Sequence, residues 1–83
     1  SESPEGVMVG MQIAEAVNRA VEKLPEELST AISLREMDGL SYEEISDVMN
    51  CPIGTVRSRI FRAREAIADE LKPLLDKSAN KRW

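Results

Sequence analysis

The chain has 83 residues, a formal net charge of −4, 42% apolar residues and 31% charged residues. This length and composition fit one small globular domain and exclude a disordered tail or two domains. Because the chain has one cysteine and no histidine, an internal disulfide, a zinc site and a Ser/His or Cys/His catalytic centre are excluded. We expect no enzyme, no metal, no cofactor and no small-molecule substrate.

The spacing of the apolar residues predicts helices throughout, since no segment alternates apolar and polar residues as a strand does. The first helix is predicted to begin near Ser3 and Pro4, which are typical helix-start residues. Its apolar residues recur every three or four positions and predict one buried stripe, made of Val7, Met11, Ala14, Val17, Val21 and Leu24.

The second helix is predicted to begin at Pro25 and to end at Gly39, because glycine adopts the left-handed conformation that follows many helices. One face of this helix carries Leu28, Ala31, Ile32 and Arg35. Arg35 has two possible roles: an ion pair with Glu36, Asp38 or the third helix, or a contact to a phosphate.

The third helix is predicted to begin after Ser41, because Ser41 and Glu44 have the spacing of a capping box. Asn50 tolerates the left-handed conformation needed to leave this helix. The short apolar face of the third helix is predicted to consist of Ile45, Val48 and Met49.

The fourth helix is predicted to begin at Pro52 and to end or kink at Pro73. Its apolar stripe is the longest in the chain: Ile53, Val56, Ile60, Ala63, Ile67, Leu71 and Leu74. We predict a linker remnant at residues 1–6, a helical domain at residues 7–75 and a flexible tail at residues 76–83. Because the chain opens at Ser1, we expect it to be a piece of a longer protein.

A short helix, a tight turn and a long helix form the pattern of a helix-turn-helix. Residues 52–65 contain four arginines and one acid, whereas residues 1–51 contain three bases and eleven acids. Salt screens charges beyond about 10 Å, so attraction to phosphate acts through the contacting face. The local charge of +3 at residues 52–65 therefore favours nucleic-acid binding, although the whole chain is acidic.

A helical wheel of the fourth helix, at about 100° per residue, separates a buried side from an outward side. The residues opposite Val56 are Ser58, Phe61, Arg62 and Glu65. An outward phenylalanine beside serine and arginine suits a helix in the major groove, where these residue types bind thymine methyl groups, base edges and guanine. Residues that flank this side would contact phosphates: Arg57, Arg59 and Arg64. Alternatively, Phe61 packs against the tail or a partner protein, and the arginines form a solvated face.

Three stretches of the chain resemble region 4 of bacterial sigma factors of the extracytoplasmic-function class, in particular the sigma-E-like members. They read LPEEL at residues 24–28, LREMDGLSYEEI at residues 34–45 and CPIGTVRSRIFRARE at residues 51–65. The resemblance implies a four-helix domain of the sigma region 4 or winged-helix-like type, without a sheet. Ser46 and Asn50 depart from the alanine and glycine common at these positions in the family.

The resemblance implies that the domain reads a GGAAC-like −35 promoter element and docks on the β flap of the RNA polymerase core. In sigma-E-like proteins bases are read from the positions of Arg57, Ser58, Phe61 and Arg62. Phosphate contacts are expected at the positions of Ser41, Tyr42, Thr55, Arg59 and Arg64. The family also implies a cytoplasmic protein, in some cases held at the inner membrane by an anti-sigma factor, and a further region, absent here, that opens the DNA.

Two alternatives remain at this point. The output domain of a LuxR-type regulator also places a helix-turn-helix among four helices, and would bind DNA without depending on polymerase. A helical interaction module would use the arginine face to bind an acidic protein, with no preference among DNA duplexes.

Overall fold

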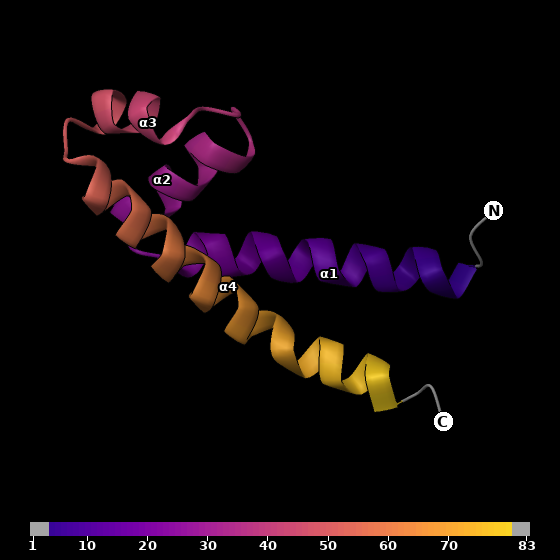
Figure 1. The fold of residues 1–83 in the computed structure, drawn as a ribbon. Coiled ribbons are helices and arrows are strands. Elements are labelled where there is room, and N and C mark those ends of the chain that lie inside the picture. Colours follow the sequence, from indigo (N-terminus) through magenta and orange to yellow (C-terminus); the bar gives the residue numbers. More distant parts are fainter. Residues whose placement is uncertain (1–3, 81–83) are drawn as a thin grey trace.

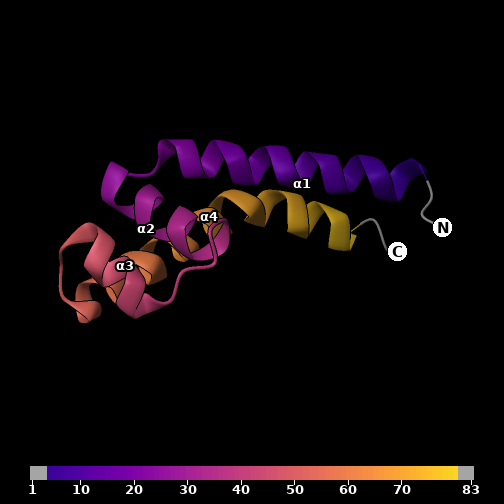
Figure 2. The ribbon, with the colours of Figure 1, turned by 90° about the horizontal axis from the view of Figure 1, so that it is seen from above.

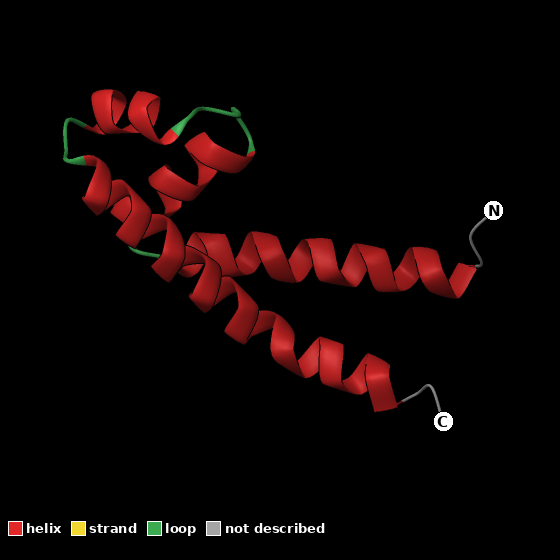
Figure 3. Ribbon diagram, viewed as in Figure 1, coloured by secondary structure: helices red, strands yellow, loops and turns green. Residues whose placement is uncertain are grey.

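The computed structural model describes the backbone of residues 4–80, together with the side chains of residue 8 and residues 10–76. Four helices occupy this range: α1 (Pro4–Lys23), α2 (Glu26–Glu36), α3 (Tyr42–Met49) and α4 (Ile53–Asn80) (Figure 1). No strand occurs between residues 4 and 80, and short loops join the helices (Figure 3). The predicted all-α fold with a helix-turn-helix, formed by α3 and α4, is confirmed.

The helix α4 is the central element, because it contacts each of the other three helices. The helices α2 and α3 gather around the first half of α4, and α1 crosses α4 beyond them (Figure 1). Seen from above, the first half of α1 and the second half of α4 extend from the same side of the body (Figure 2). The molecule is therefore elongated, with extents of 47 × 25 × 19 Å.

The hydrophobic core lies where α2, α3 and the first half of α4 meet. Its largest fully buried side chains are Ile45, Val56 and Ile60, each at most 1% exposed. Burying an aliphatic side chain of this size stabilises the fold by about 1.5–3 kcal/mol. The predicted stripe of the fourth helix is confirmed, since Val56, Ile60 and Ala63 are buried and its other members are half-buried.

The predicted stripe of the first helix is partly wrong. Met11 is 61% exposed and Ala14 is also exposed, whereas Ala16 and Ala20 are buried at 4% and 2% exposure. The partner of α1 is α4, and small side chains such as alanine allow two helices to approach closely. The buried face of α1 is thus set by close packing rather than by its largest apolar residues. The side chain of Val7 lies outside the described residues.

Two further expectations about the helices need correction. Val48 was expected in the apolar face of α3, but it is 62% exposed because α3 packs only a narrow face, with Ile45 fully buried. The helix α4 does not end at Pro73 but continues through it to Asn80. Proline has no backbone N–H, so the carbonyl one turn before Pro73 has no helical hydrogen-bond donor. Because Pro73 is exposed, that carbonyl can accept a hydrogen bond from water instead.

The predicted limits of the linker, the domain and the tail stay predictions. The first helix begins at residue 4 and the last ends at residue 80. None of the helices in this described range has the length and apolarity needed to cross a membrane.

Candidate nucleic-acid interface

The start of α3 is fixed by the predicted capping box, which is confirmed. The Ser41 hydroxyl accepts a hydrogen bond from the Glu44 backbone N–H at 3.1 Å, and the Ser41 N–H donates to the Glu44 carboxylate at 2.8 Å. The Ser41 N–H that donates to the charged carboxylate, and to a lesser degree the Ser41 side chain, lower the pKa of Glu44 below its ordinary value. The first turn of α3, which carries Tyr42, is therefore held in one orientation.

The turn between α3 and α4 is held by backbone and side-chain hydrogen bonds. Asn50 has the predicted left-handed conformation, with φ of 52°. The Cys51 N–H donates to the Ser46 carbonyl at 3.1 Å, and the Ser46 hydroxyl donates to the Cys51 carbonyl. Ser46 and Asn50, the two departures from the family pattern, therefore both serve this turn and fix the angle at which α4 leaves it.

One face of α4 points into solvent, as the helical wheel predicts. The four residues expected to read bases, Arg57, Ser58, Phe61 and Arg62, are all exposed. Phe61 is 63% exposed, so no described part of the chain covers it. The alternative that Phe61 packs against the tail falls on residues 76–83, of which only the side chain of Asp76 is described. The alternative that it packs against a partner protein stays a prediction.

An open groove of about 260 Å³ lies between α2 and the first turns of α3 and α4. Its walls include three of the predicted contact residues, Ser41, Tyr42 and Arg57, and also Arg35. The Arg35 guanidinium lies 5.4 Å from the centre of the Tyr42 ring, and its Nη1 donates to the Leu40 carbonyl at 2.8 Å. Arg35 forms no ion pair with a described carboxylate. The ion pair predicted for Arg35 is therefore absent among the described residues, and the contact to a phosphate stays a prediction.

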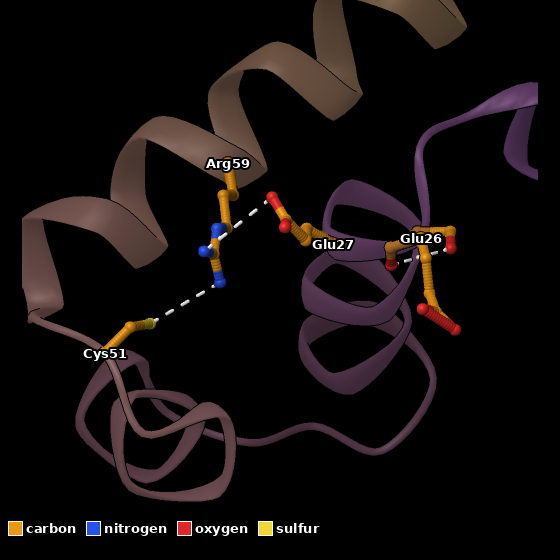
Figure 4. A network of polar contacts seen from close by, with 5 residues as sticks. Glu26, Glu27, Cys51 and Arg59 are labelled. Atoms are coloured by element: carbon orange, nitrogen blue, oxygen red, sulfur yellow. Dashed lines mark hydrogen bonds and ion pairs between the residues drawn. The ribbon is translucent and has the colours of Figure 1, made fainter.

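Arg59 and Arg64, both expected to contact phosphates, form ion pairs with carboxylates of α2. The side chain of Arg59 is 22% exposed and lies between Glu27 and Cys51 (Figure 4). Its Nη2 is 3.8 Å from a Glu27 carboxylate oxygen, and its Nη1 donates to the Cys51 sulfur at 3.6 Å.

Arg64 forms the shorter of the two ion pairs to α2. Its Nη2 donates to the Glu36 carboxylate at 2.6 Å, while both side chains remain about half exposed, at 52% and 54%. This hydrogen bond raises the pKa of Arg64 above its ordinary value. Sequence analysis missed both pairs, because their partners lie on another helix and are far apart in the chain; for Arg64 and Glu36 the separation is 28 residues.

Thr55 lies in the first turn of α4 and is half-buried, with its backbone N–H donating to the Pro52 carbonyl at 2.9 Å. The remaining predicted phosphate contacts, Ser41 and Tyr42, are half-buried at the start of α3. The structure therefore brings the N-terminal ends of α3 and α4 together, with the exposed face of α4 beside them.

A second, apolar groove of about 480 Å³ lies among α1, α2 and α4. Its apolar walls are Val17, Val21, Ile32, Met37 and Ile67, and Met37 is 83% exposed. Ile67 lies on the buried side of α4, opposite Phe61. The apolar groove therefore opens on a different side of α4 from Phe61.

Comparison with known proteins identifies a family. Residues 14–67 match the family described as Sigma-70, region 4. The ECF RNA polymerase sigma-E factor of Escherichia coli (strain K12) is 58% identical over 73 residues, and that of Salmonella typhi has the same identity. The RNA polymerase sigma-H factor of Pseudomonas aeruginosa is 60% identical over 74 residues.

These matches cover 88–89% of the chain but only 38% of each relative, so the chain spans well under half the length of the relatives it matches. Region 4 is part of non-enzymatic transcription initiation factors, so the expectation that the chain is not an enzyme is confirmed. The family match covers more than half of the chain, including the helix-turn-helix and its turn, and the chain therefore belongs to the Sigma-70 region 4 family.

Proposed function

We propose that this domain reads the −35 element of promoters through the exposed face of α4, as part of a sigma factor. The observation that carries the proposal is the exposure of Phe61 between two arginines that form no ion pair with a described carboxylate, Arg57 and Arg62. An exposed phenylalanine loses the stabilisation that burial would give it. A major groove that presents thymine methyl groups supplies the missing apolar contact.

The base contacts follow from the chemistry of the four exposed side chains. Arg57 and Arg62 can each bind a guanine through two hydrogen bonds, and Ser58 can bond to a base edge. For a GGAAC-like element we expect Arg62 and Arg57 near the guanine end.

Phosphate contacts would fix the position of α4 in the groove. The predicted residues Ser41, Tyr42, Thr55, Arg59 and Arg64 lie beside the exposed face, at the starts of α3 and α4 or along α4. The groove lined by Arg35, Tyr42 and Arg57 adds Arg35 to this set, because its guanidinium remains exposed beside the Tyr42 ring. Glu43 also lines this groove, so the charges of Arg35 and Arg57 would have to outweigh one carboxylate for a phosphate to bind there.

The apolar groove among α1, α2 and α4 supports the second half of the proposal. A DNA-binding domain that docks on the β flap of the RNA polymerase core needs an apolar surface away from its DNA face, and this groove opens on another side of α4. An anti-sigma factor would occupy the same domain in the inactive state and could hold it at the inner membrane. The whole sigma factor would act in the cytoplasm, where the promoter and polymerase are found.

The test is fluorescence anisotropy with a short GGAAC duplex and a scrambled duplex of the same composition, each at two salt concentrations. We expect the domain to prefer GGAAC, and Arg62→Ala to lose about 1–3 kcal/mol of binding free energy and relax the preference at one base step. Equal binding of the wild-type domain to both duplexes would contradict −35 reading and favour a LuxR-type target. Binding to core polymerase alone, without DNA preference in the assembled complex, would favour a protein-interaction module.

A further inference from the structure

The four arginines of residues 52–65 lie in two different electrostatic environments. Arg57 and Arg62 form no ion pair with any described carboxylate, whereas Arg59 and Arg64 are paired with Glu27 and Glu36 of α2. Arg59 and Arg64 keep their charge, but each lies beside a carboxylate that offsets it, whereas Arg57 and Arg62 have no such partner among the described residues. The positive charge of α4, which first indicated nucleic-acid binding, is in effect halved by α2.

The two pairs differ in how readily a phosphate could separate them. Arg59 is only 22% exposed and is also held by the Cys51 sulfur, so its position does not depend on Glu27 alone. Arg64 and Glu36 are both about half exposed and are joined by one hydrogen bond at 2.6 Å. Solvent, and any anion in solution, can therefore reach the Arg64 guanidinium.

We propose that Glu36 competes with DNA phosphate for the guanidinium of Arg64 and so limits the affinity of the domain for every duplex. This inference rests on the proposed function, in which Arg64 contacts a phosphate. In the free domain the pair has no net charge, so Arg64 adds little to the attraction of a polyanion. On binding, a phosphate oxygen replaces the Glu36 oxygen, and an unpaired carboxylate is left beside the DNA. Both effects weaken binding without involving a base.

The expected size of the effect follows from the exposure of the pair. Exposed ion pairs typically change an equilibrium by about 1.4- to 5-fold. Each phosphate contact made by a released arginine steepens the dependence of log K on log salt by about 0.9. Glu36→Gln should therefore raise the affinity for the GGAAC duplex and the scrambled duplex by the same factor, within 1.4- to 5-fold, and steepen the salt slope by up to about 0.9.

The experiment is a double-mutant cycle of Glu36→Gln and Arg64→Ala in the anisotropy assay described above, with circular dichroism to establish that every variant is folded. The matched control is Glu26→Gln, which makes the same charge change on the same helix at an exposed residue without an ion pair among the described side chains. In the Arg64→Ala background, Glu36→Gln should give a clearly smaller gain in affinity, because only the repulsion between the free carboxylate and the DNA is left to remove.

Four outcomes would overturn the inference. A weaker affinity of Glu36→Gln would mean that Glu36 positions Arg64 on the phosphate. An equal gain in the Arg64→Ala background, or in Glu26→Gln, would mean that only overall charge matters. If the wild-type domain binds no duplex, alone or with polymerase, the proposed function fails and this inference fails with it. If the wild-type domain prefers GGAAC but Glu36→Gln has the affinity of the wild type, only this inference fails.

Discussion

The two ends of the molecule are built in different ways. At the compact end, where α2, α3 and the first half of α4 meet, the fully buried side chains include Ile45, Val56 and Ile60. At the open end, formed by the first half of α1 and the second half of α4, Met8, Met11 and Leu75 are 51–62% exposed. The candidate DNA face lies on the compact end. The difference shows that the residues expected to read bases stand on the best-packed part of the domain, where their positions are least free to vary.

The largest expected effect comes from placing one charged residue at each end of the molecule and comparing the losses of stability. Val56→Asp places a carboxylate at a position with 0% exposure, and should lower the free energy of unfolding by more than about 4 kcal/mol, because a buried charge without a partner is among the most costly substitutions. Ala14→Asp, in the exposed part of α1, should change it by less than about 1 kcal/mol. Urea unfolding followed by circular dichroism measures both. Similar losses for the two variants would mean that the ends do not differ in packing.

A smaller test addresses the start of α3, which carries part of the expected phosphate contact. Ser41→Ala removes the hydroxyl that accepts the Glu44 N–H, and should cost about 1 kcal/mol of unfolding free energy. Ser29→Ala makes the same chemical change within α2, where alanine is favoured; it removes only a hydrogen bond to the Glu26 carbonyl of the same helix, and should cost less than Ser41→Ala.

The capping box also predicts a dependence on pH. The pKa of Glu44 is lowered in the folded domain, so the stability it contributes is fully present above its unfolded pKa and is lost as the pH falls through its folded pKa. The stability difference between wild type and Glu44→Gln, which has no titrating carboxylate at this position, should therefore shrink below about pH 4. A difference that stays constant from pH 7 to pH 3 would show that the Glu44 carboxylate takes no part in the cap.

The smallest expected effect separates phosphate contacts from base contacts at the compact end. Arg59→Ala should weaken binding to all duplexes alike and reduce the salt slope by about 1. Arg19→Ala, on an exposed part of α1, should leave the slope unchanged. A shift in sequence preference in Arg59→Ala would instead indicate that Arg59 contacts a base.

Local signals predicted much of the compact end. The capping box depends on residues three positions apart, the left-handed turn on Asn50, and the outward direction of Phe61 on the period of one helix. Each of these features is set within one or two helical turns, so the sequence contains what is needed to predict it.

Features that depend on a second helix could not be predicted in this way. The burial of Ala16 and Ala20 instead of Met11 depends on how closely α1 approaches α4. The exposure of Val48 depends on which narrow face of α3 meets α4. The pairing of Arg64 with Glu36 depends on the placement of α2, which no helical period reveals.

The continuation of α4 through Pro73 has a mechanical consequence. At 1.5 Å per residue, its 28 residues form a rod about 42 Å long. The stretch from Phe61 to Asn80 is then about 28 Å long, so tilting the exposed face by about 10° moves the far end of the rod by about 5 Å. A small change in the orientation of α4 at the proposed DNA face therefore becomes a larger displacement at the far end of the helix. A tilt of about 10° at the proposed DNA face would thus displace the opposite end of the domain by more than the roughly 4 Å of a side-chain contact.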